Sequence, residues 1–183
     1  MKKKKTEKVS FYKFFRKFPN EQSARLYFEN EIWGKTGRYC PHCGSAKTVE
    51  VKNEKPAPCR CKDCRKHWSV RTKSVLTESN IPLNKWLLAI LITTKGVLSY
   101  KLARDIDVTQ KTAWFLAHRI RKIHEDQAEV RLDFPIEAYE TYQRYAEEFA
   151  TRQNSRPLPT IEQIGKTVEG VMGKRLKYKE LIS

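Results

Sequence analysis

Two C-x2-C pairs, separated by 17 residues, set a narrow limit on what residues 39–78 can form. Two residues between cysteines allow one tight turn to present both thiolates to a single ion, and four thiolates complete the tetrahedral sphere that Zn²⁺ prefers. Gly44, directly after the first pair, supplies the backbone freedom that such a turn often needs. The pattern therefore predicts a zinc ribbon that holds one structural Zn²⁺, with no open position for a catalytic water. The predicted ligands are Cys40, Cys43, Cys61 and Cys64.

Other side chains near these pairs are alternative ligands. Cys59 could replace Cys61, although its spacing to Cys64 is less suitable, and His42 and His67 are also ligand types that zinc accepts. Histidines at such positions are more often ribbon-surface residues that could touch phosphate. A redox role for one C-x2-C pair is the remaining alternative, but two copies at this spacing favour a metal. Short β-type runs at 47–51 and 67–70 would supply strands of the ribbon.

A second pattern, from Ser99 to His118, has the apolar spacing of a helix-turn-helix. Asp107 stands where the turn usually has glycine, and Asp tolerates a left-handed backbone better than most residues. Thr109 is the predicted N-cap of the second helix, and the apolar segment 83–94 suits the buried first helix of a three-helix unit. The core positions of the pattern are Leu102, Ile106, Val108, Ala113 and Leu116.

The second helix of such a unit enters the major groove with its N-terminal residues at base edges. Gln pairs with adenine and Lys contacts guanine, whereas basic residues further along hold phosphates. Trp114 and Phe115 are expected to pack against the ribbon, with contact to a thymine methyl group as the alternative. The predicted DNA-binding residues are Thr109, Gln110, Lys111, Thr112, Arg119, Arg121 and Lys122.

The charge of the chain is +16 and lies entirely in its first part. Residues 1–125 carry 28 basic and 11 acidic residues, whereas residues 126–183 carry 9 and 10. The basic part would attract a polyanion, most simply DNA or RNA, and double-stranded DNA is the expected partner; a solubilising surface is the alternative. The longest apolar run, Trp86–Ile92, has seven residues, so a membrane span is not expected. With no secretory signal expected, five cysteines fit reduced thiols in the cytoplasm.

A zinc ribbon followed by this helix-turn-helix pattern resembles the N-terminal half of bacterial insertion-sequence transposases whose catalytic half is a DDE-type, RNase H-like domain. The resemblance ends near Arg121. It implies binding to the terminal inverted repeats of a mobile element. The motifs that carry it are Phe18-Pro-Asn-Glu-Gln-Ser, Tyr39-Cys-Pro-His-Cys-Gly, Cys61-Lys-Asp-Cys-Arg-Lys-His-Trp, Ile81-Pro-Leu-Asn-Lys-Trp, Leu102-Ala-Arg-Asp and Val108-Thr-Gln-Lys-Thr-Ala-Trp-Phe.

The C-terminal part departs from that family. The sequence Ile136-Glu-Ala-Tyr-Glu-Thr-Tyr142 stands where the family has a strand with the first metal-binding Asp, so Tyr139 would occupy the Asp position. A phenol is neutral at pH 7 and a poor Mg²⁺ ligand, so no catalytic residue is assigned. Residues 165–171 then resemble the next strand of that domain. The alternative is that residues 133–150 form a plain amphipathic helix.

Together these features predict a mostly α-helical α+β protein. Its parts would be a basic disordered tail (1–17), a helix and zinc ribbon (18–78) whose helix begins at the N-cap Asn20, a helix-turn-helix (79–125), and a C-terminal remnant of helix and possible strands (126–183). The expected function is zinc-dependent, sequence-specific DNA binding without strand-transfer activity, in the bacterial cytoplasm at the nucleoid, as a monomer or homodimer. The alternatives are a fragment of an active transposase completed by another chain or frame, and a ribbon adaptor for protein or RNA.

Overall fold

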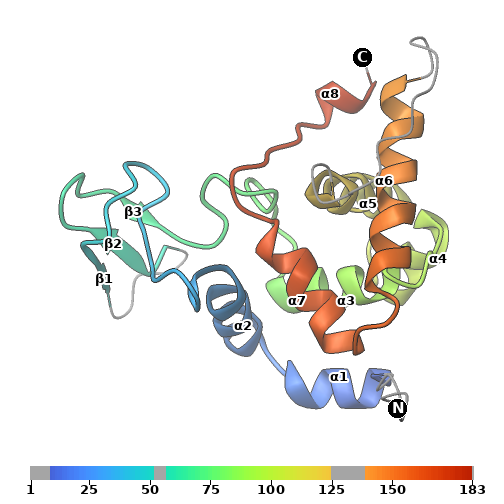
Figure 1. Ribbon diagram of the computed structural model, residues 1–183, viewed down its shortest axis with the longest axis horizontal. Coiled ribbons are helices and arrows are strands. Elements are labelled where there is room, and N and C mark those ends of the chain that lie inside the picture. Colours follow the sequence, from blue (N-terminus) through green and yellow to red (C-terminus); the bar gives the residue numbers. More distant parts are fainter. Residues whose placement is uncertain (1–8, 52–56, 125–138, 183) are drawn as a thin grey trace.

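The computed structural model describes residues 9–51, 57–124 and 139–182, and Figure 1 shows a small sheet beside a group of packed helices. The mostly helical α+β class predicted from the sequence is confirmed. The helices are α1 (Phe11–Lys17), α2 (Glu21–Trp33), α3 (Leu83–Thr93), α4 (Ser99–Asp105), α5 (Gln110–His124), α6 (Tyr139–Ser155), α7 (Thr160–Glu169) and α8 (Lys179–Ile182); the strands are β1 (Thr48–Glu50), β2 (Cys59–Cys61) and β3 (His67–Trp68).

The N-terminal part contains a helix that the sequence analysis did not predict. Residues 1–8 of the expected disordered tail lie outside the described residues, but α1 is helical, so the prediction is wrong for 11–17. The Ser10 hydroxyl caps α1 by accepting a hydrogen bond from the Lys13 amide. Phe14 is fully buried, with its ring centroid 5.1 Å from that of Phe18. A local cap and one buried aromatic anchor therefore order this segment.

Helix α2 begins where the sequence predicts. Asn20 is the N-cap, and its side chain and that of Ser23 form a reciprocal capping box. The helix ends at Gly34, and Gly37 follows with a φ of +77°. Its buried side chains, Phe28 and Trp33 among them, face the rest of the protein. The N-cap Asn20 and the glycine Gly34 thus set the two ends of α2.

The sheet is antiparallel in the order β1-β2-β3. Thr48 pairs with Cys61 at one end, and Arg60 pairs with His67 across β2 and β3. The outer strands lie inside the two runs expected from the sequence, whereas the central strand β2 was not foreseen. Its Cys-Arg-Cys sequence has none of the β-branched or aromatic residues by which a strand is recognised.

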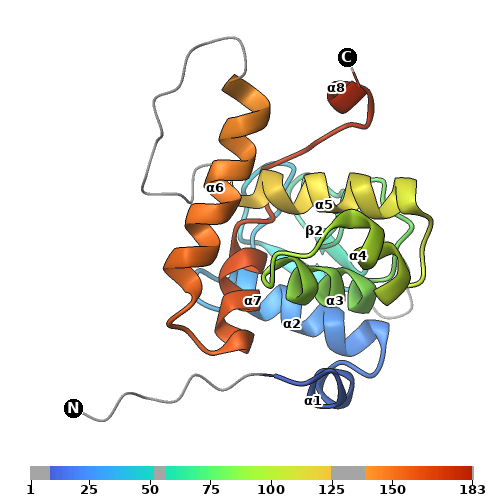
Figure 2. The same cartoon turned by 90° about the vertical axis from the view of Figure 1, so that its right-hand side faces the viewer.

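The three helices expected of the helix-turn-helix unit are present as α3, α4 and α5. Helix α3 is buried except at the half-buried Asn84 and Lys85, and it packs against α2, α4, α5 and α7 (Figure 2). Trp86 and Leu91 at its centre are completely inaccessible to solvent. A helix that is apolar all round is stable only when covered on every side, and α3 is therefore the axis around which the other helices assemble.

The C-terminal part is helical where strands were expected. Residues 165–169 belong to α7, so the predicted strand over 165–171 is wrong. Ile164 and Val168 are fully buried at helical spacing, and Gly165 allows close approach to the Tyr27 and Glu31 side chains of α2. Residues 139–142 lie in α6, as the helical alternative requires; residues 136–138 lie outside the described part of the chain.

Candidate metal centre and nucleic-acid interface

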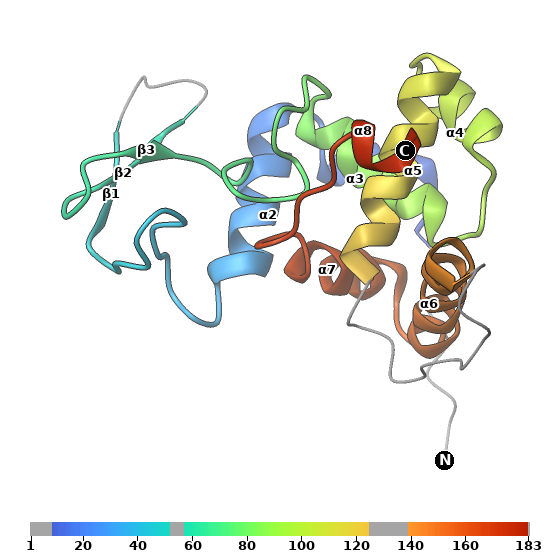
Figure 3. The same ribbon diagram turned by 90° about the horizontal axis from the view of Figure 1, so that it is seen from above.

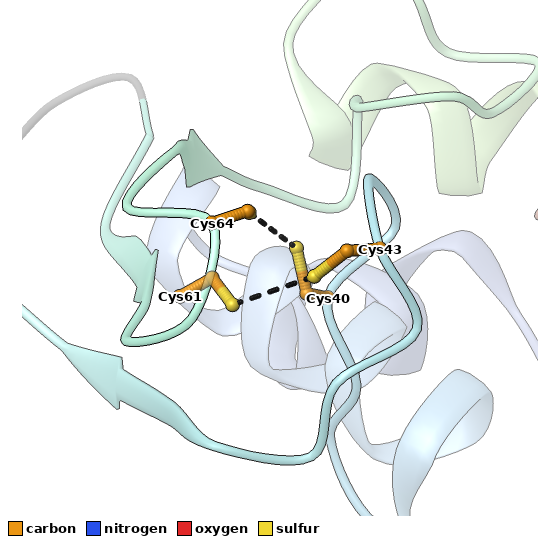
Figure 4. Close-up of side chains that lie close together, drawn as sticks. All are labelled: Cys40, Cys43, Cys61 and Cys64. Carbon is orange, nitrogen blue, oxygen red and sulfur yellow. Dashed lines mark hydrogen bonds between the residues drawn. The ribbon is translucent and has the colours of Figure 1, made fainter.

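Four cysteine sulfurs converge between the two turns that flank β1 and β2 (Figure 4). The Sγ atoms of Cys40 and Cys64 lie 3.6 Å apart, as do those of Cys43 and Cys61, and all four lie within 4.8 Å of one another. Sulfurs bound at about 2.3 Å around a tetrahedral ion are about 3.8 Å apart. The donor set and its spacing therefore fit one structural Zn²⁺, as the sequence predicts.

Both turns of the metal centre use the same backbone conformation. In the first, the Gly44 amide donates to the Cys40 carbonyl (2.8 Å) and the His42 amide donates to the Cys40 sulfur (3.4 Å). Gly44 has a φ of +76°, and Arg65, which follows the second pair, has a φ of +57°. A left-handed residue directly after each C-x2-C pair reverses the chain so that both sulfurs point to one place.

Local hydrogen bonds also prepare the ligands for the metal. Backbone amides, that of Cys64 first and that of Asp63 as well, lower the pKa of the Cys61 thiol to about 7. The Ser45 hydroxyl donates to the Asp63 carboxylate at 2.7 Å, and this bond lowers the pKa of that carboxyl. Because Ser45 follows the first pair and Asp63 lies within the second, the bond also joins the two turns to each other.

Cys59 is a core residue and not a ligand. It lies on the same face of β2 as Cys61 and is equally buried, but its sulfur does not belong to the group of four. Burial raises the pKa of the Cys59 thiol to about 11, which keeps it protonated. Within the part of the chain that the structure describes, His42 and His67 also lie outside that group. The alternatives to Cys61 are therefore ruled out by position.

The ribbon is attached to the helices by two sets of contacts. Trp33 of α2 packs edge-on against Trp68 of β3, with ring centroids 5.1 Å apart. Beyond the ribbon, the Arg71 guanidinium donates to the Ser79 carbonyl (2.6 Å) and pairs with the Glu21 carboxylate. These contacts join the ribbon to α2 and to the segment before α3, and Figures 1 and 3 show the sheet beside α2, apart from α4 and α5.

Helix α5 presents its first turn to solvent. Asp107 before it has a φ of +54°, the left-handed conformation expected at this turn. The Thr109 hydroxyl accepts a hydrogen bond from the Thr112 amide at 3.3 Å and caps the helix, as predicted. Gln110 and Lys111 are exposed, and Thr112 is half-buried. Polar side chains that can donate to and accept from a base edge are thus grouped at one helix end.

Two of the predicted phosphate contacts are engaged inside the protein. Arg119 is only 6% exposed, and its guanidinium donates to the Thr77 carbonyl at 2.8 Å. Arg121 is paired with Glu148 of α6 and lies over the Tyr145 ring. From the sequence, Arg119 and Arg121 are assigned to phosphates. In the structure, the Arg119 side chain ties α5 to residues 69–82 between β3 and α3, here named the ribbon linker, and the Arg121 side chain ties α5 to α6.

The aromatic residues of α5 also pack differently from the prediction. Trp114 and Phe115 contact Tyr178 near the C-terminus, with ring centroids 6.3 Å and 5.6 Å apart, and no ring contact of either with the described part of the ribbon is found. Trp114 also stacks near His118 at 4.4 Å. No signal in the sequence connects Tyr178 with Trp114 and Phe115, because more than sixty residues separate it from both.

The metal centre and its sheet define a metal-binding zinc ribbon. Comparison with known families agrees: residues 19–67 match the family described as the transposase zinc-ribbon domain of the IS1595 type. The matched segment contains α2 and all four cysteines. This segment is therefore similar to the zinc ribbon of insertion-sequence transposases. Searches of curated proteins and of solved structures gave no significant match. None of the helices described is long and apolar enough to cross a membrane.

Proposed function

We propose that this transposase-derived chain binds double-stranded DNA in a sequence-specific manner, with α3, α4 and α5 acting as a helix-turn-helix. The observation that carries the proposal is the first turn of α5. It places Gln110 and Lys111 in solvent, beyond a left-handed Asp107 and a Thr109 cap. Gln can bond bidentately to adenine and Lys can bond to guanine in the major groove. The proposed contacts are Thr109, Gln110, Lys111, Thr112 and Lys122.

The charge distribution supports a polyanionic partner. The excess of 17 positive charges in residues 1–125 includes the ribbon and the α3–α5 unit. Such an excess accelerates association with DNA and makes the affinity depend steeply on salt. Base-specific discrimination is then left to the few polar side chains at the start of α5, each worth about 1–3 kcal/mol against a wrong base.

The ribbon supports the same function because it is attached to the proposed helix-turn-helix of α3, α4 and α5. Arg71 and Glu21 connect the residue after the ribbon to the N-terminus of α3, where the Leu83 amide donates to the Glu21 carboxylate. Zinc would hold the ribbon folded, and the folded ribbon would keep the segment that leads to α3 in its place. We therefore propose that DNA binding requires the metal.

The proposed sites are the terminal inverted repeats of a mobile element or similar sequences, bound in the bacterial nucleoid, by a monomer or a homodimer. We propose that this chain carries out no strand transfer by itself. Tyr139 stands at the position where the resembled family has its first metal-binding Asp, and it lies in helix α6 instead of a strand. A helix at this point does not supply the converging carboxylates that two-metal phosphoryl transfer needs.

The test is selection of bound duplexes from a random pool by the zinc-loaded protein, with a chelator-treated sample as control. We expect one motif to be enriched and the enrichment to disappear with the metal. Gln110→Ala should relax the preference at one position, whereas Gln22→Ala, an exposed glutamine on α2, should leave the motif unchanged. Salt-sensitive binding to every sequence alike would refute specific recognition. Preference for structured RNA would favour the adaptor alternative.

A further inference from the structure

The segment after α7 follows a defined path along the ribbon linker to α5. The Val75 amide donates to the Val171 carbonyl (3.1 Å) and the Gly173 amide donates to the Lys73 carbonyl (3.0 Å). Beyond this point residues 174–179, here named the C-terminal strip, run across α5 toward α8 (Figures 2 and 3). The Lys174 ammonium donates to the Ile123 carbonyl near the end of α5 at 2.9 Å.

Tyr178 fastens the strip to the start of α5. The Lys111 ammonium lies 4.8 Å from the centre of the Tyr178 ring, and the Phe115 ring lies 5.6 Å from it. With 3.6 residues per turn, Lys111 and Phe115 lie on the side of α5 opposite to the buried Ala113 and Ile120. The strip therefore lies on the outward side of the helix that we propose to read DNA.

The charge of the strip shows what kind of partner it fits. It contains Lys174, Arg175, Lys177 and Lys179 and no acidic residue. Lys174 is bonded to α5, and Arg175 pairs with Glu78 of the linker. Lys177 and Lys179 are exposed, and no ion pair to either side chain is found among the described residues. The carboxylate of Glu180, the residue after the strip, accepts a hydrogen bond from the Lys177 amide at 3.1 Å. The exposed Lys177 and Lys179 thus flank Tyr178, whose ring lies against the Lys111 ammonium.

The positive charge of the strip is the opposite of what a segment that competes with DNA for α5 would need. A competitor for a basic surface gains from acidic residues, whereas the strip places further cations beside Lys111. Like charges held together by aromatic packing repel one another until an anion neutralises them. When the first turn of α5 enters the major groove, the phosphate groups on either side of that groove come close to these cations and can neutralise them.

We propose that the C-terminal strip is a second DNA-binding element, in which Lys177 and Lys179 contact backbone phosphates and Tyr178 positions Lys111. The inference rests on the proposed function of α5 and extends it. A lysine is a flexible point charge, so these contacts add affinity and orientation without reading sequence. Tyr178 is a positioning residue that acts through Lys111.

The experiment compares Lys177→Ala/Lys179→Ala with the unchanged full chain on the duplex selected above, over a range of salt concentrations. The matched control is Arg16→Ala/Arg156→Ala, which removes the same charge from exposed positions on α1 and in the turn between α6 and α7, apart from the strip. Two lost phosphate contacts should reduce the slope of log K against log salt by about 1.8 and weaken binding roughly 10- to 30-fold at 0.15 M salt. The control should change the slope much less, and both variants should keep their zinc and their helical circular dichroism.

The possible results separate this inference from the proposed function. If the strip variant binds like the unchanged chain while Gln110→Ala still relaxes the motif, the inference fails and the proposed function stands. If the strip variant binds more tightly, the strip is a cover that DNA must displace, and the inference is also overturned. If the unchanged chain binds no duplex at all, the proposed function itself fails. Tyr178→Phe should preserve binding and Tyr178→Ala should weaken it if the ring positions Lys111.

Discussion

Arg121→Ala should destabilise the fold instead of weakening a phosphate contact. The Arg121 guanidinium pairs with the Glu148 carboxylate at 2.5 Å, and the two side chains are 13% and 11% exposed. The guanidinium carbon also lies 4.4 Å from the centre of the Tyr145 ring. These contacts join α5 to α6, so their loss would loosen the packing of α6 on the rest of the protein.

The magnitude follows from the burial of this pair. Removing one partner of a fully buried ion pair costs about 3–5 kcal/mol, whereas exposed pairs contribute about 0–1 kcal/mol. Since both side chains keep slight exposure and Arg152 remains 3.9 Å from Glu148 as a second cation, we expect about 2 kcal/mol. At this chain length that corresponds to a fall in Tm of about 4–8 °C.

The assay is urea unfolding of the zinc-loaded protein, followed by circular dichroism, for Arg121→Ala, Glu148→Ala and the double variant. A coupling free energy of at least about 1 kcal/mol in this cycle is the expected result. Lys101→Ala, which removes an exposed cation from α4, is the control for the loss of charge and should leave stability nearly unchanged. A lost phosphate contact would instead change the slope of log K against log salt by about 0.9. If Arg121→Ala keeps full stability but shows that same change of slope, the structural role assigned to Arg121 is refuted.

Further predictions concern the two turns of the metal centre and the linker. Gly44→Ala should lower the unfolding free energy by about 1–2 kcal/mol, because the added Cβ meets nothing within 4 Å and only the positive φ opposes it; unchanged thermal unfolding would contradict this. Arg65→Gly should raise stability by about 0.5 kcal/mol, since relief of the left-handed strain slightly exceeds the entropy that glycine adds to the unfolded chain; a loss of zinc affinity would show that Arg65 does more. Cys64→Ser should abolish zinc retention and DNA binding while most helical circular dichroism remains, which metal analysis and a binding titration on one sample would check. Glu21→Ala should cost about 1–2 kcal/mol because its carboxylate accepts from the Leu83 amide and pairs with Arg71; equal urea midpoints for this variant and the unchanged chain would count against that bond.

The features predicted correctly are those decided within a few residues of sequence. The spacing of Cys40, Cys43, Cys61 and Cys64 specifies four thiolates around one ion, because each pair needs only one turn of backbone. The boundaries of α2 follow from a capping residue and a glycine. The turn at Asp107 and the cap at Thr109 follow in the same way, since both depend on side chains bonding to their own neighbouring backbone.

The incorrect predictions concern residues whose surroundings come from distant parts of the chain. The apolar pattern of residues 165–171 fits a short strand as well as a helix, and only packing against α2 and α3 selects α7. The strand β2 forms because Cys59–Cys61 lies between two partners and beside the metal ligands, not because of its own propensity. From the sequence alone, an arginine on the proposed DNA-binding helix is predicted to contact phosphate, because its partner within the protein is seen only in the tertiary structure.

The sequence by itself determined the ligand set, the helix caps and the order of ribbon and helices, because these depend on local hydrogen bonds and on spacing along the chain. Only the tertiary structure decided that Arg119 and Arg121 are engaged within the protein while Gln110 and Lys111 face solvent. It also placed Tyr178 and the C-terminal strip on α5. The physical reason is that burial and ion pairing depend on which distant segments meet, and that is fixed by the collective packing of all helices around α3.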